Sequence, residues 1–215
     1  MAIVFTGDEF AEGGRFIAKT LERTGTKASF FFTGRFYRNP RFKTIIEQLK
    51  SNGNYLGAHG DQHLLYCDWK NRDSLLVTAD EFISDLKKND EELHRFGITT
   101  FSARFFLPAY EWYNDSISAW TKQMGLQLVD YTPGTLSHAD YTTPDEKNYR
   151  SSDLIYQSIV GYEQSHPCGL NGFILLMHIG TDRKRTDKFY DRLPELIQWL
   201  KQRNYQLVRI DELLK

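Results

Sequence analysis

The sequence has little cysteine and no long apolar run. Cys67 and Cys168 are the only cysteines among 215 residues, too few for a disulfide scaffold, and they are compatible with one bridge or with two free thiols. No stretch approaches the ~20 apolar residues of a membrane-spanning helix, and segment 1–5 lacks the basic start and long apolar core of a signal peptide. We therefore expect neither a disulfide-stapled domain nor a membrane span.

An excess of charge of one sign is also missing. The chain has 27 Lys and Arg residues against 28 Asp and Glu residues, with a formal net charge of -1. A nucleic-acid-binding face would have to be a local basic patch, and the cluster Arg183–Arg185 is short. Because 40% of the residues are hydrophobic, the chain can bury one full core. We expect a single domain spanning residues 1–215 and no nucleic-acid partner.

Strand-like and helix-like segments alternate along the whole chain. Short apolar or β-rich runs alternate with segments whose apolar residues recur at helical spacing, and Thr78 with Glu81 has the spacing of a capping box. The alternation predicts a parallel α/β barrel or open sheet of about seven strands, in which loops after the strand ends carry the chemistry. The expected strands are 2–6, 28–33, 55–58, 101–107, 126–131, 173–178 and 206–210, and the expected helices are 14–24, 40–53, 78–97, 114–124, 151–164 and 187–204.

Polar residues follow several of these strands at the same end. Asp8 and Glu9 follow the first strand, His59 follows the third and His178 ends the sixth. A long irregular segment, 132–150, comes after the fifth strand, and loops of this length are often functional. Barrel topology would bring these distant residues to one rim.

Two histidines four residues apart, His59 and His63, lie beside Asp61, which looks exposed in the sequence. Imidazole nitrogen is a ligand for zinc, cobalt, nickel, copper or iron(II), and a catalytic site needs about three protein ligands. The third ligand would come from Asp8 or Glu9. Each pair also has a structural interpretation, since the histidines could be plain surface residues and Asp8–Glu9 could begin a helix.

Together these segments resemble the ordered motifs of the polysaccharide deacetylases of carbohydrate esterase family 4, from residue 2 to the C-terminus. Thr6–Glu9 resembles T-F-D-D, Ala28–Gly34 resembles A-T-F-F-x-x-G, His59–His63 resembles H-S/T-x-x-H, Leu107–Asn114 is similar to R-P-P-Y, and Ile174–His178 resembles I-x-L-x-H. The resemblance implies a distorted (β/α) barrel.

The resemblance also implies the roles of the polar residues. Asp8 would be the general base, while Glu9, His59 and His63 would bind one divalent metal ion, zinc with cobalt or nickel as alternatives. His178 would protonate the leaving amine. These roles suit amide or ester hydrolysis, because a metal activates water and a carboxylate accepts its proton.

The remaining expected site residues surround this centre. The backbone N–H of Tyr110 would bind the oxyanion, Leu176 would line the pocket for the acetyl methyl group, and Asp140, rather than Asp130, would orient His178. The aromatic side chains after the fourth strand, which include Trp112 and Tyr113, suit stacking against sugar rings.

The sequence departs from the family motifs at two positions. Glu9 stands where the family has Asp, and Leu107 stands where it has the Arg that pairs with the base. Arg104, Arg183 or Arg185 could replace that arginine, and His138, in the long loop, could reach the site.

We therefore expect a metal-dependent hydrolase that removes acetyl groups from a polysaccharide, in the first place N-acetyl groups of an amino-sugar polymer. The alternatives are an O-acetyl glycan esterase and a catalytically impaired carbohydrate-binding barrel of the same fold. The family resemblance also implies an exported protein acting on extracellular or wall glycan.

Overall fold

Six parallel strands form the centre of the molecule. The computed structural model describes all residues 1–215, and the strand order in the sheet is β5-β4-β3-β2-β1-β6. The expected parallel α/β fold is confirmed, with six strands where about seven were expected. The strands are β1 Ala2–Gly7, β2 Ser29–Phe32, β3 Tyr55–Ala58, β4 Phe105–Phe106, β5 Gln127–Leu128 and β6 Ile174–His178.

The sheet curls into a distorted barrel because its two edges meet just beyond β5. Thr132 donates its N–H to the carbonyl of Ile174 at 3.0 Å, and Ile174 donates its N–H to the Thr132 hydroxyl at 3.0 Å. Inward-facing side chains fill the space enclosed by the strands, as the alternation of side chains along a strand requires. This inner cluster contains Ala2, Val4, Phe31, Tyr55, Phe105, Leu107, Val129, Ile174, Leu176 and Ile210.

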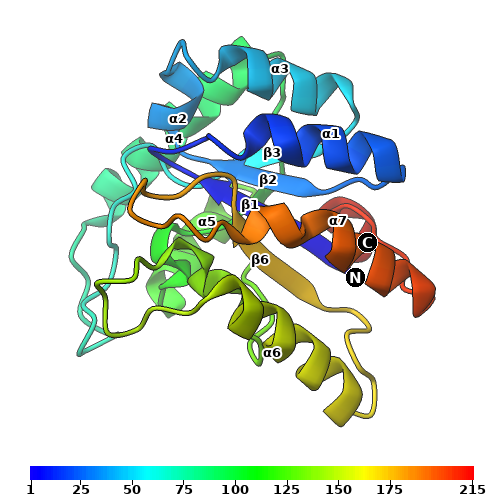
Figure 1. The fold of residues 1–215 in the computed structure, drawn as a ribbon. Coiled ribbons are helices and arrows are strands. Elements are labelled where there is room, and N and C mark those ends of the chain that lie inside the picture. Colours follow the sequence, from blue (N-terminus) through cyan, green and yellow to red (C-terminus); the bar gives the residue numbers. More distant parts are fainter.

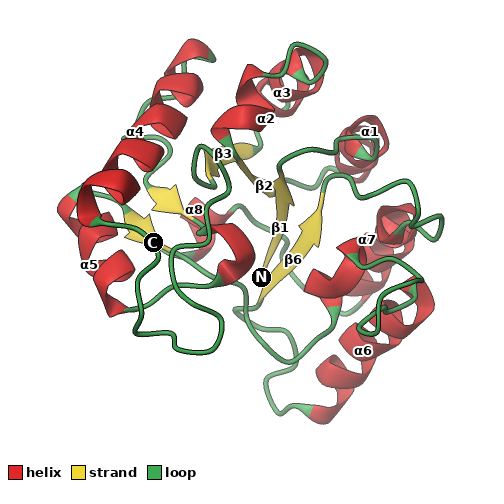
Figure 2. Cartoon of the chain, turned by 90° about the vertical axis from the view of Figure 1, so that its left-hand side faces the viewer, coloured by secondary structure: helices red, strands yellow, loops and turns green.

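Helices surround the strands and cover their outer face (Figures 1 and 2). The outward-facing residues of β1, Ile3 and Phe5, belong to a larger core cluster that packs under these helices. The α-helices are α1 Gly14–Thr24, α2 Gly34–Arg38, α3 Lys43–Ser51, α4 Ala79–Arg95, α5 Asp115–Gln123, α6 Ser152–Ser165, α7 Leu193–Gln202 and α8 Ile210–Leu213, and short 3-10 helices span η1 Ala109–Glu111, η2 Ser137–Tyr141 and η3 Phe189–Arg192.

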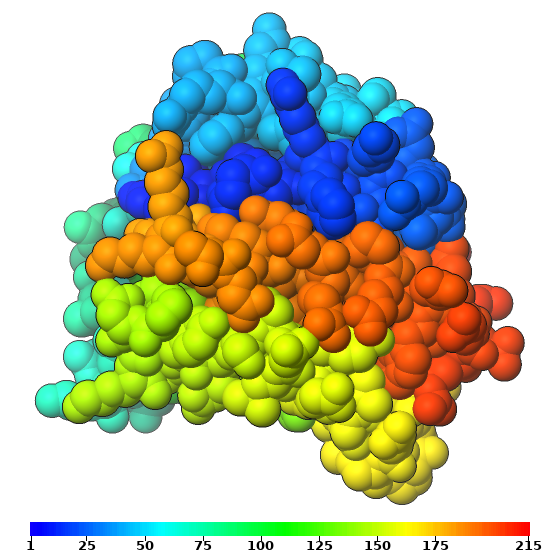
Figure 3. All heavy atoms as spheres, viewed as in Figure 1, coloured from blue at the N-terminus to red at the C-terminus, as the bar shows by residue number.

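The C-terminal part of the chain packs against the N-terminal part. The orange segment containing α7 lies between the blue segment of α1 and the yellow-green segment of α6 (Figure 3). Leu193, Leu196, Ile197 and Leu200 form the buried stripe of α7. This packing joins both ends of the sequence in one core.

The prediction of a strand over residues 206–210 is wrong. Two hydrogen bonds join this segment to Met1, from the Met1 amino group to Gln206 O and from Val208 N to Met1 O. The chain then turns into α8, whose first residue donates its N–H to the Ser29 hydroxyl at 2.8 Å. The segment therefore forms no ladder, and its apolar residue Ile210 closes the bottom of the inner cluster.

Helix boundaries differ from expectation at two places. A short helix, α2, directly follows β2 and was not predicted; the Thr33 hydroxyl caps it by accepting the N–H of Phe36 at 3.1 Å. The expected helix 187–204 is interrupted, with η3 preceding α7, which carries proline in its first turn.

Two other features of the sequence are settled by the fold. Both cysteines are free thiols, Cys67 buried and Cys168 exposed. None of the helices combines the length and the apolar character required to cross a membrane.

The capping box at the start of α4 is the best local stability test. The Thr78 hydroxyl accepts the N–H of Glu81, and Glu81 Oε2 accepts the N–H of Thr78 at 2.7 Å. We expect Thr78→Ala to lower the free energy of unfolding by about 1 kcal/mol, because it leaves a helix N–H without a partner. Urea denaturation measures this change. Thr78→Ser, which keeps the hydroxyl, is the control, and equal losses in both variants would contradict the capping role.

Candidate active site

A cleft of about 890 Å³ opens where the strands end at their carboxyl termini. Residues that follow five of the six strands line it, as expected for a barrel of this topology. They include Thr6, Asp8 and Glu9 after or at the end of β1, His59 and His63 after β3, Tyr110 and Trp112 after β4, Tyr131 and His138 after β5, and His178 at the end of β6. A second cavity, of about 440 Å³, borders the start of β3 and contains none of the expected site residues.

Asp8 is held by two side chains, Thr33 between β2 and α2 and Arg35 in the first turn of α2. The Thr33 hydroxyl donates to Asp8 Oδ1 at 2.8 Å, and the Arg35 guanidinium donates from Nε to Oδ1 at 3.1 Å and from Nη2 to Oδ2. This two-pronged contact fixes the plane of the carboxylate. Arg35 therefore provides the cation that the sequence lacks at Leu107.

The three arginines considered from the sequence do not pair with Asp8. Arg104 lies over the ring of Phe105 at 4.9 Å, and Arg183 is exposed. Arg185 is fully buried and donates to the carbonyls of Thr142 and Arg150. Arg35 was missed because α2 was not predicted; the Thr-Gly pair at positions 33 and 34, which begins that helix, was the available signal.

His59 is buried and its ring is fixed by the backbone. Its Nδ1–H donates to the carbonyl of Leu107 at 2.7 Å, so Nε2 keeps its lone pair for another partner. The His63 ring lies 5.1 Å from the His59 ring, centroid to centroid, and 4.4 Å from that of Tyr110. Burial lowers the pKa of His59 well below its ordinary value and the pKa of His63 to about 4. Both imidazoles are thus neutral near pH 7, the form that binds metal ions.

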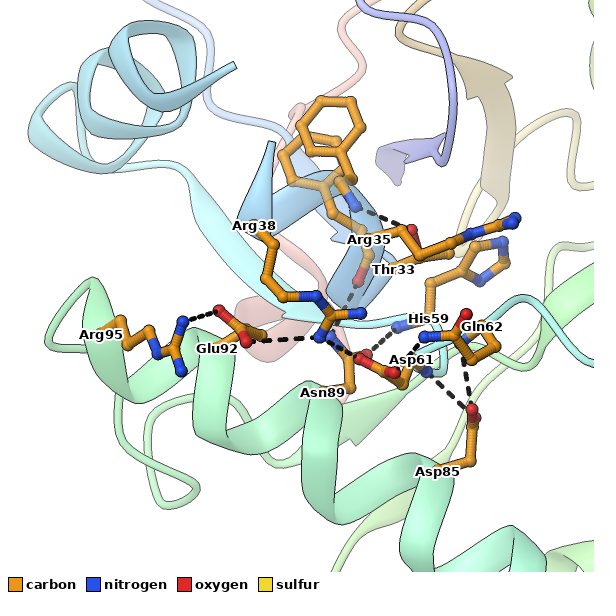
Figure 4. Close-up of polar contacts among 12 residues, drawn as sticks. Thr33, Arg35, Arg38, His59, Asp61, Gln62, Asp85, Asn89, Glu92 and Arg95 are labelled. Atoms are coloured by element: carbon orange, nitrogen blue, oxygen red, sulfur yellow. Dashed lines mark hydrogen bonds and ion pairs between the residues drawn. The ribbon is translucent and has the colours of Figure 1, made fainter. Parts of the chain in front are cut away.

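A buried polar network holds the loop between these histidines (Figure 4). Asp61 is only 2% exposed and pairs with Arg38, which also contacts Glu92, and this corrects the impression that Asp61 is a surface acid. Asp85 accepts the N–H groups of Asp61 and Gln62, each at 3.0 Å. The charges are therefore paired or hydrogen-bonded, as buried charges must be.

Other parts of α2 and α4 complete this support. Asn89 accepts the N–H of His59 at 2.9 Å and donates to the carbonyl of Phe32 at 3.3 Å, so α4 fixes the position where the chain leaves β3. A Cβ atom at Gly34 would lie 1.8 Å from Asp61 Oδ1, so only glycine permits α2 to approach the loop this closely.

Glu9 lies at the mouth of the cleft and does not join the histidines. Its side chain is exposed and makes no hydrogen bond or ion pair, and no three His, Cys, Asp or Glu side chains converge in an arrangement that would hold a metal ion. Two neutral imidazoles suit a divalent metal of the zinc class. Of the three expected ligands, the structure brings together only the two histidines.

His178 and Asp140 form a tight pair on the opposite wall. The Nδ1–H of His178 donates to Asp140 Oδ1 at 2.6 Å, and the backbone N–H of His178 donates to Oδ2 at 2.9 Å. Burial opposes the protonation of His178, but attraction to Asp140 outweighs it and raises the pKa of the imidazole. Asp130 instead accepts the N–H of Tyr131, and burial raises its pKa to about 6. The structure therefore brings Asp140, and not Asp130, to His178.

The residues after β4 have an unusual backbone. Tyr110 and Glu111 have φ values of 61° and 53°, in the left-handed region that non-glycine residues rarely adopt. The N–H of Tyr110 makes no hydrogen bond within the protein.

Trp112 lines the cleft and donates its indole N–H to Asp68 O, whereas Tyr113 lies outside the cleft lining, with its ring near Arg72. Leu176 is fully buried in the inner cluster and does not reach the cleft surface.

Exposed aromatic side chains gather at the rim of the cleft. Four of the eight exposed large hydrophobic residues line it, and only Tyr110 was singled out from the sequence. Such side chains suit stacking against sugar rings because they present an apolar face to solvent. They are Phe10, Trp69, Tyr110 and Tyr141.

Comparisons with solved structures agree with this architecture. A peptidoglycan N-acetylglucosamine deacetylase, Bc1960, shares 21% identity, with a TM-score of 0.75 over 99% of this chain and 86% of its own. The Xyl-CE4 domain of a multidomain xylanase from the hindgut metagenome of Trinervitermes trinervoides shares 21% identity, with a TM-score of 0.72 over 99% of this chain and 87% of its own.

A CE4 family pseudoenzyme from Bacillus anthracis is also similar in structure. It shares 20% identity, with a TM-score of 0.73 over the whole of this chain and 64% of its own, so the present chain spans less than two-thirds of that protein. No curated protein sequence matches the chain. The polysaccharide deacetylase family model matches residues 7–129, which is more than half of the sequence and includes Asp8, both histidines of the loop and Tyr110. The chain therefore belongs to the polysaccharide deacetylase family.

Proposed function

We propose that this protein is a metal-dependent hydrolase that removes N-acetyl groups from an amino-sugar polymer. The observation that carries the proposal is the arrangement of three parts around one cleft. These parts are a carboxylate held by Arg35, two neutral imidazoles and a histidine paired with Asp140. Hydrolysis of an acetamide needs a base, an oxyanion donor and an acid for the leaving nitrogen, and the cleft has a candidate for each.

Asp8 is the proposed base. Its carboxylate accepts a proton from the water that attacks the acetyl carbonyl carbon. Arg35 and Thr33 hold its orientation through three hydrogen bonds. Positioned carboxylates of this kind contribute by proton transfer in the transition state.

Tyr110 and His178 act on the other side of the acetyl group. The free N–H of Tyr110, a residue that lines the cleft, donates to the oxyanion. His178, held by Asp140 through Nδ1, has Nε2 available to give its proton to the leaving nitrogen as the C–N bond breaks. The products are then acetate and a free amine.

His59 and His63 are the proposed ligands of the metal. A divalent ion bound there, zinc or alternatively cobalt or nickel, would polarise the carbonyl and lower the pKa of water. We retain Glu9 as the proposed third ligand, which requires its exposed side chain to turn toward the histidines.

The rim aromatics support a carbohydrate substrate, with Trp112 and Trp69 as stacking surfaces. Tyr113 and Leu176 have weaker support, because neither lines the cleft. The similarity to a peptidoglycan N-acetylglucosamine deacetylase favours an acetylated glycan of the cell exterior and an exported protein. The runner-up functions are an O-acetyl glycan esterase and, given the similarity to a pseudoenzyme, an impaired carbohydrate-binding barrel.

The metal proposal predicts zinc binding that depends on His59. We expect the wild-type protein to bind zinc in calorimetry and to release acetate from N-acetylglucosamine oligomers, and His59→Ala to lose both. The exposed His166 gives a control, because His166→Ala should keep both properties. Acetate release that survives His59→Ala would refute the metal mechanism. Oligosaccharide binding without acetate release from either N- or O-acetylated glycans would favour the carbohydrate-binding alternative.

The contact between Arg35 and Asp8 predicts a loss of turnover when the arginine is removed. Arg35→Ala should lower kcat about 10- to 100-fold with little change in zinc affinity, because the carboxylate loses its fixed orientation. Arg41→Ala is the control, since Arg41 is exposed and contacts Asn39. Asp8→Asn should abolish turnover and retain zinc. Loss of zinc in Asp8→Asn would exchange the proposed roles of Asp8 and Glu9.

Asp140→Asn should lower the pKa of His178. The wild-type pKa is raised by Asp140, so His178 holds its proton to higher pH than an ordinary histidine. The stabilisation from this pair is full below the unfolded pKa and is lost as the pH rises through the folded pKa. In the variant, the alkaline limb of the kcat profile should shift to lower pH. NMR titration of the imidazole measures the pKa directly; an equal shift in Asp130→Asn would contradict the assignment.

A further inference from the structure

Glu111 is a cleft residue that the mechanism above does not use. It follows Tyr110, and both residues have positive φ. A non-glycine residue in this conformation costs roughly 1 kcal/mol. Such strain persists where the surrounding structure requires it, and it is concentrated at functional sites. Here the strained pair directs one side chain toward His63 and leaves the other, Glu111, lining the cleft.

The carboxyl group of Glu111 has no partner in the protein. It is half-buried, and no hydrogen bond or ion pair reaches it. Burial raises its pKa to about 7; the nearby His178 lowers the pKa, and Asp130 and Asp140 raise it further. Asp140 is already paired with His178. Glu111 is therefore a cleft acid without a hydrogen bond or ion pair of its own, and the nearby His178 is paired with Asp140.

The basic side chains around the cleft are all committed elsewhere. Arg35 pairs with Asp8, and Lys184 pairs with Asp145 at 3.0 Å. Arg72 lies over the ring of Trp112 at 4.2 Å and donates to Tyr113 O. None of these three cations pairs with Glu111.

Two polar atoms that line the same cleft also lack partners. Thr6 is 1% exposed, and its hydroxyl makes no hydrogen bond; it lies beside His178 in the register of β1 and β6. The Nδ1 atom of His138 is buried and unpaired as well. Buried polar atoms normally have a hydrogen-bond partner, so these two point independently to a polar ligand on the cleft floor.

We propose that Glu111 binds the ammonium group of an amino sugar. A carboxylate that has no ion pair in the protein matches an ammonium ion. The rings of Tyr131 and Tyr141 line the same cleft and suit the sugar face and the cation. The ammonium group would be either the one released in the reaction or one on a neighbouring deacetylated unit. This inference rests on the proposed function and adds to it a binding site for a free amino group of the substrate or product.

Binding measurements test the proposal without requiring turnover. By calorimetry at pH 7, wild-type protein should bind a glucosamine trimer, and Glu111→Gln should bind it about tenfold or more weakly, as expected for a lost charge-assisted hydrogen bond. Binding of the N-acetylglucosamine trimer should change less than about twofold, since it has no ammonium group. Glu146→Gln is the matched control, because Glu146 is an exposed acid of the same cleft.

A second variant separates recognition from structure. Glu111→Gly removes the carboxyl group and places a residue suited to positive φ, so it should melt at the same or a higher temperature than the wild type while losing affinity for the glucosamine trimer. Unchanged affinity for this trimer in both variants would overturn the proposal. Equal loss of both trimers in Glu111→Gln would also overturn it, since that pattern indicates general damage to the cleft.

Kinetic measurements distinguish the two sources of the ammonium group. If it is the released one, the glucosamine trimer should inhibit acetate release competitively, and Glu111→Gln should remove the inhibition. If it belongs to a neighbouring unit, partially deacetylated oligomers should react faster than fully acetylated ones, and the variant should erase this preference. Glu111-dependent binding in a protein that releases no acetate would leave the ammonium site standing and refute the proposed deacetylase function.

Discussion

Parallel pairing of β1 with β6 and with β2 is the constraint on which the site depends. The register sets Thr6 opposite both His178 and Phe31, so the residues that leave these strands emerge at one level of the barrel. Asp8 then meets Thr33 and Arg35, which follow β2, while His178 ends β6 on the other side. The inner cluster below is apolar, so polar side chains can collect only above it. A shift of one residue in any of these strands would turn the polar groups toward the helices and the apolar ones toward the cleft.

The loop from His59 to His63 illustrates how the fold supports a pair of ligand-type side chains. Helix α4 provides Asp85 and Asn89, whose side chains bind backbone N–H groups of the loop, and Arg38 of α2 neutralises Asp61. Removing one partner from such a buried network costs more than the pair itself contributes, because a charge remains without compensation. The network therefore specifies the conformation of the loop. Burial keeps the two imidazoles neutral, and both line the cleft.

The two departures from the family motifs have different structural consequences. The change at Leu107 is compensated, since the aliphatic side chain joins the inner cluster and Arg35 reaches Asp8 from a different element. The change from Asp to Glu at position 9 is not compensated. The longer side chain of Glu9 extends to solvent, and no other acid takes its place beside the histidines.

The sequence by itself determined the order of strands and helices, the family, and the identity of most polar residues of the cleft. These features depend on local periodicity and on motifs of adjacent residues. The structure of segment 206–210 could not be predicted from the sequence, since its β-like composition serves to close the barrel floor rather than to pair. The sequence also could not identify the partner of Asp8. Any arginine has the right charge, and only the packing of α2 brings Arg35 within reach of the carboxylate. The tertiary structure also determines that Glu111 has no partner. The backbone conformation of Tyr110 and Glu111 places the carboxyl group in the cleft, and the nearby cations pair with other residues. Short-range sequence patterns encode neither of these features.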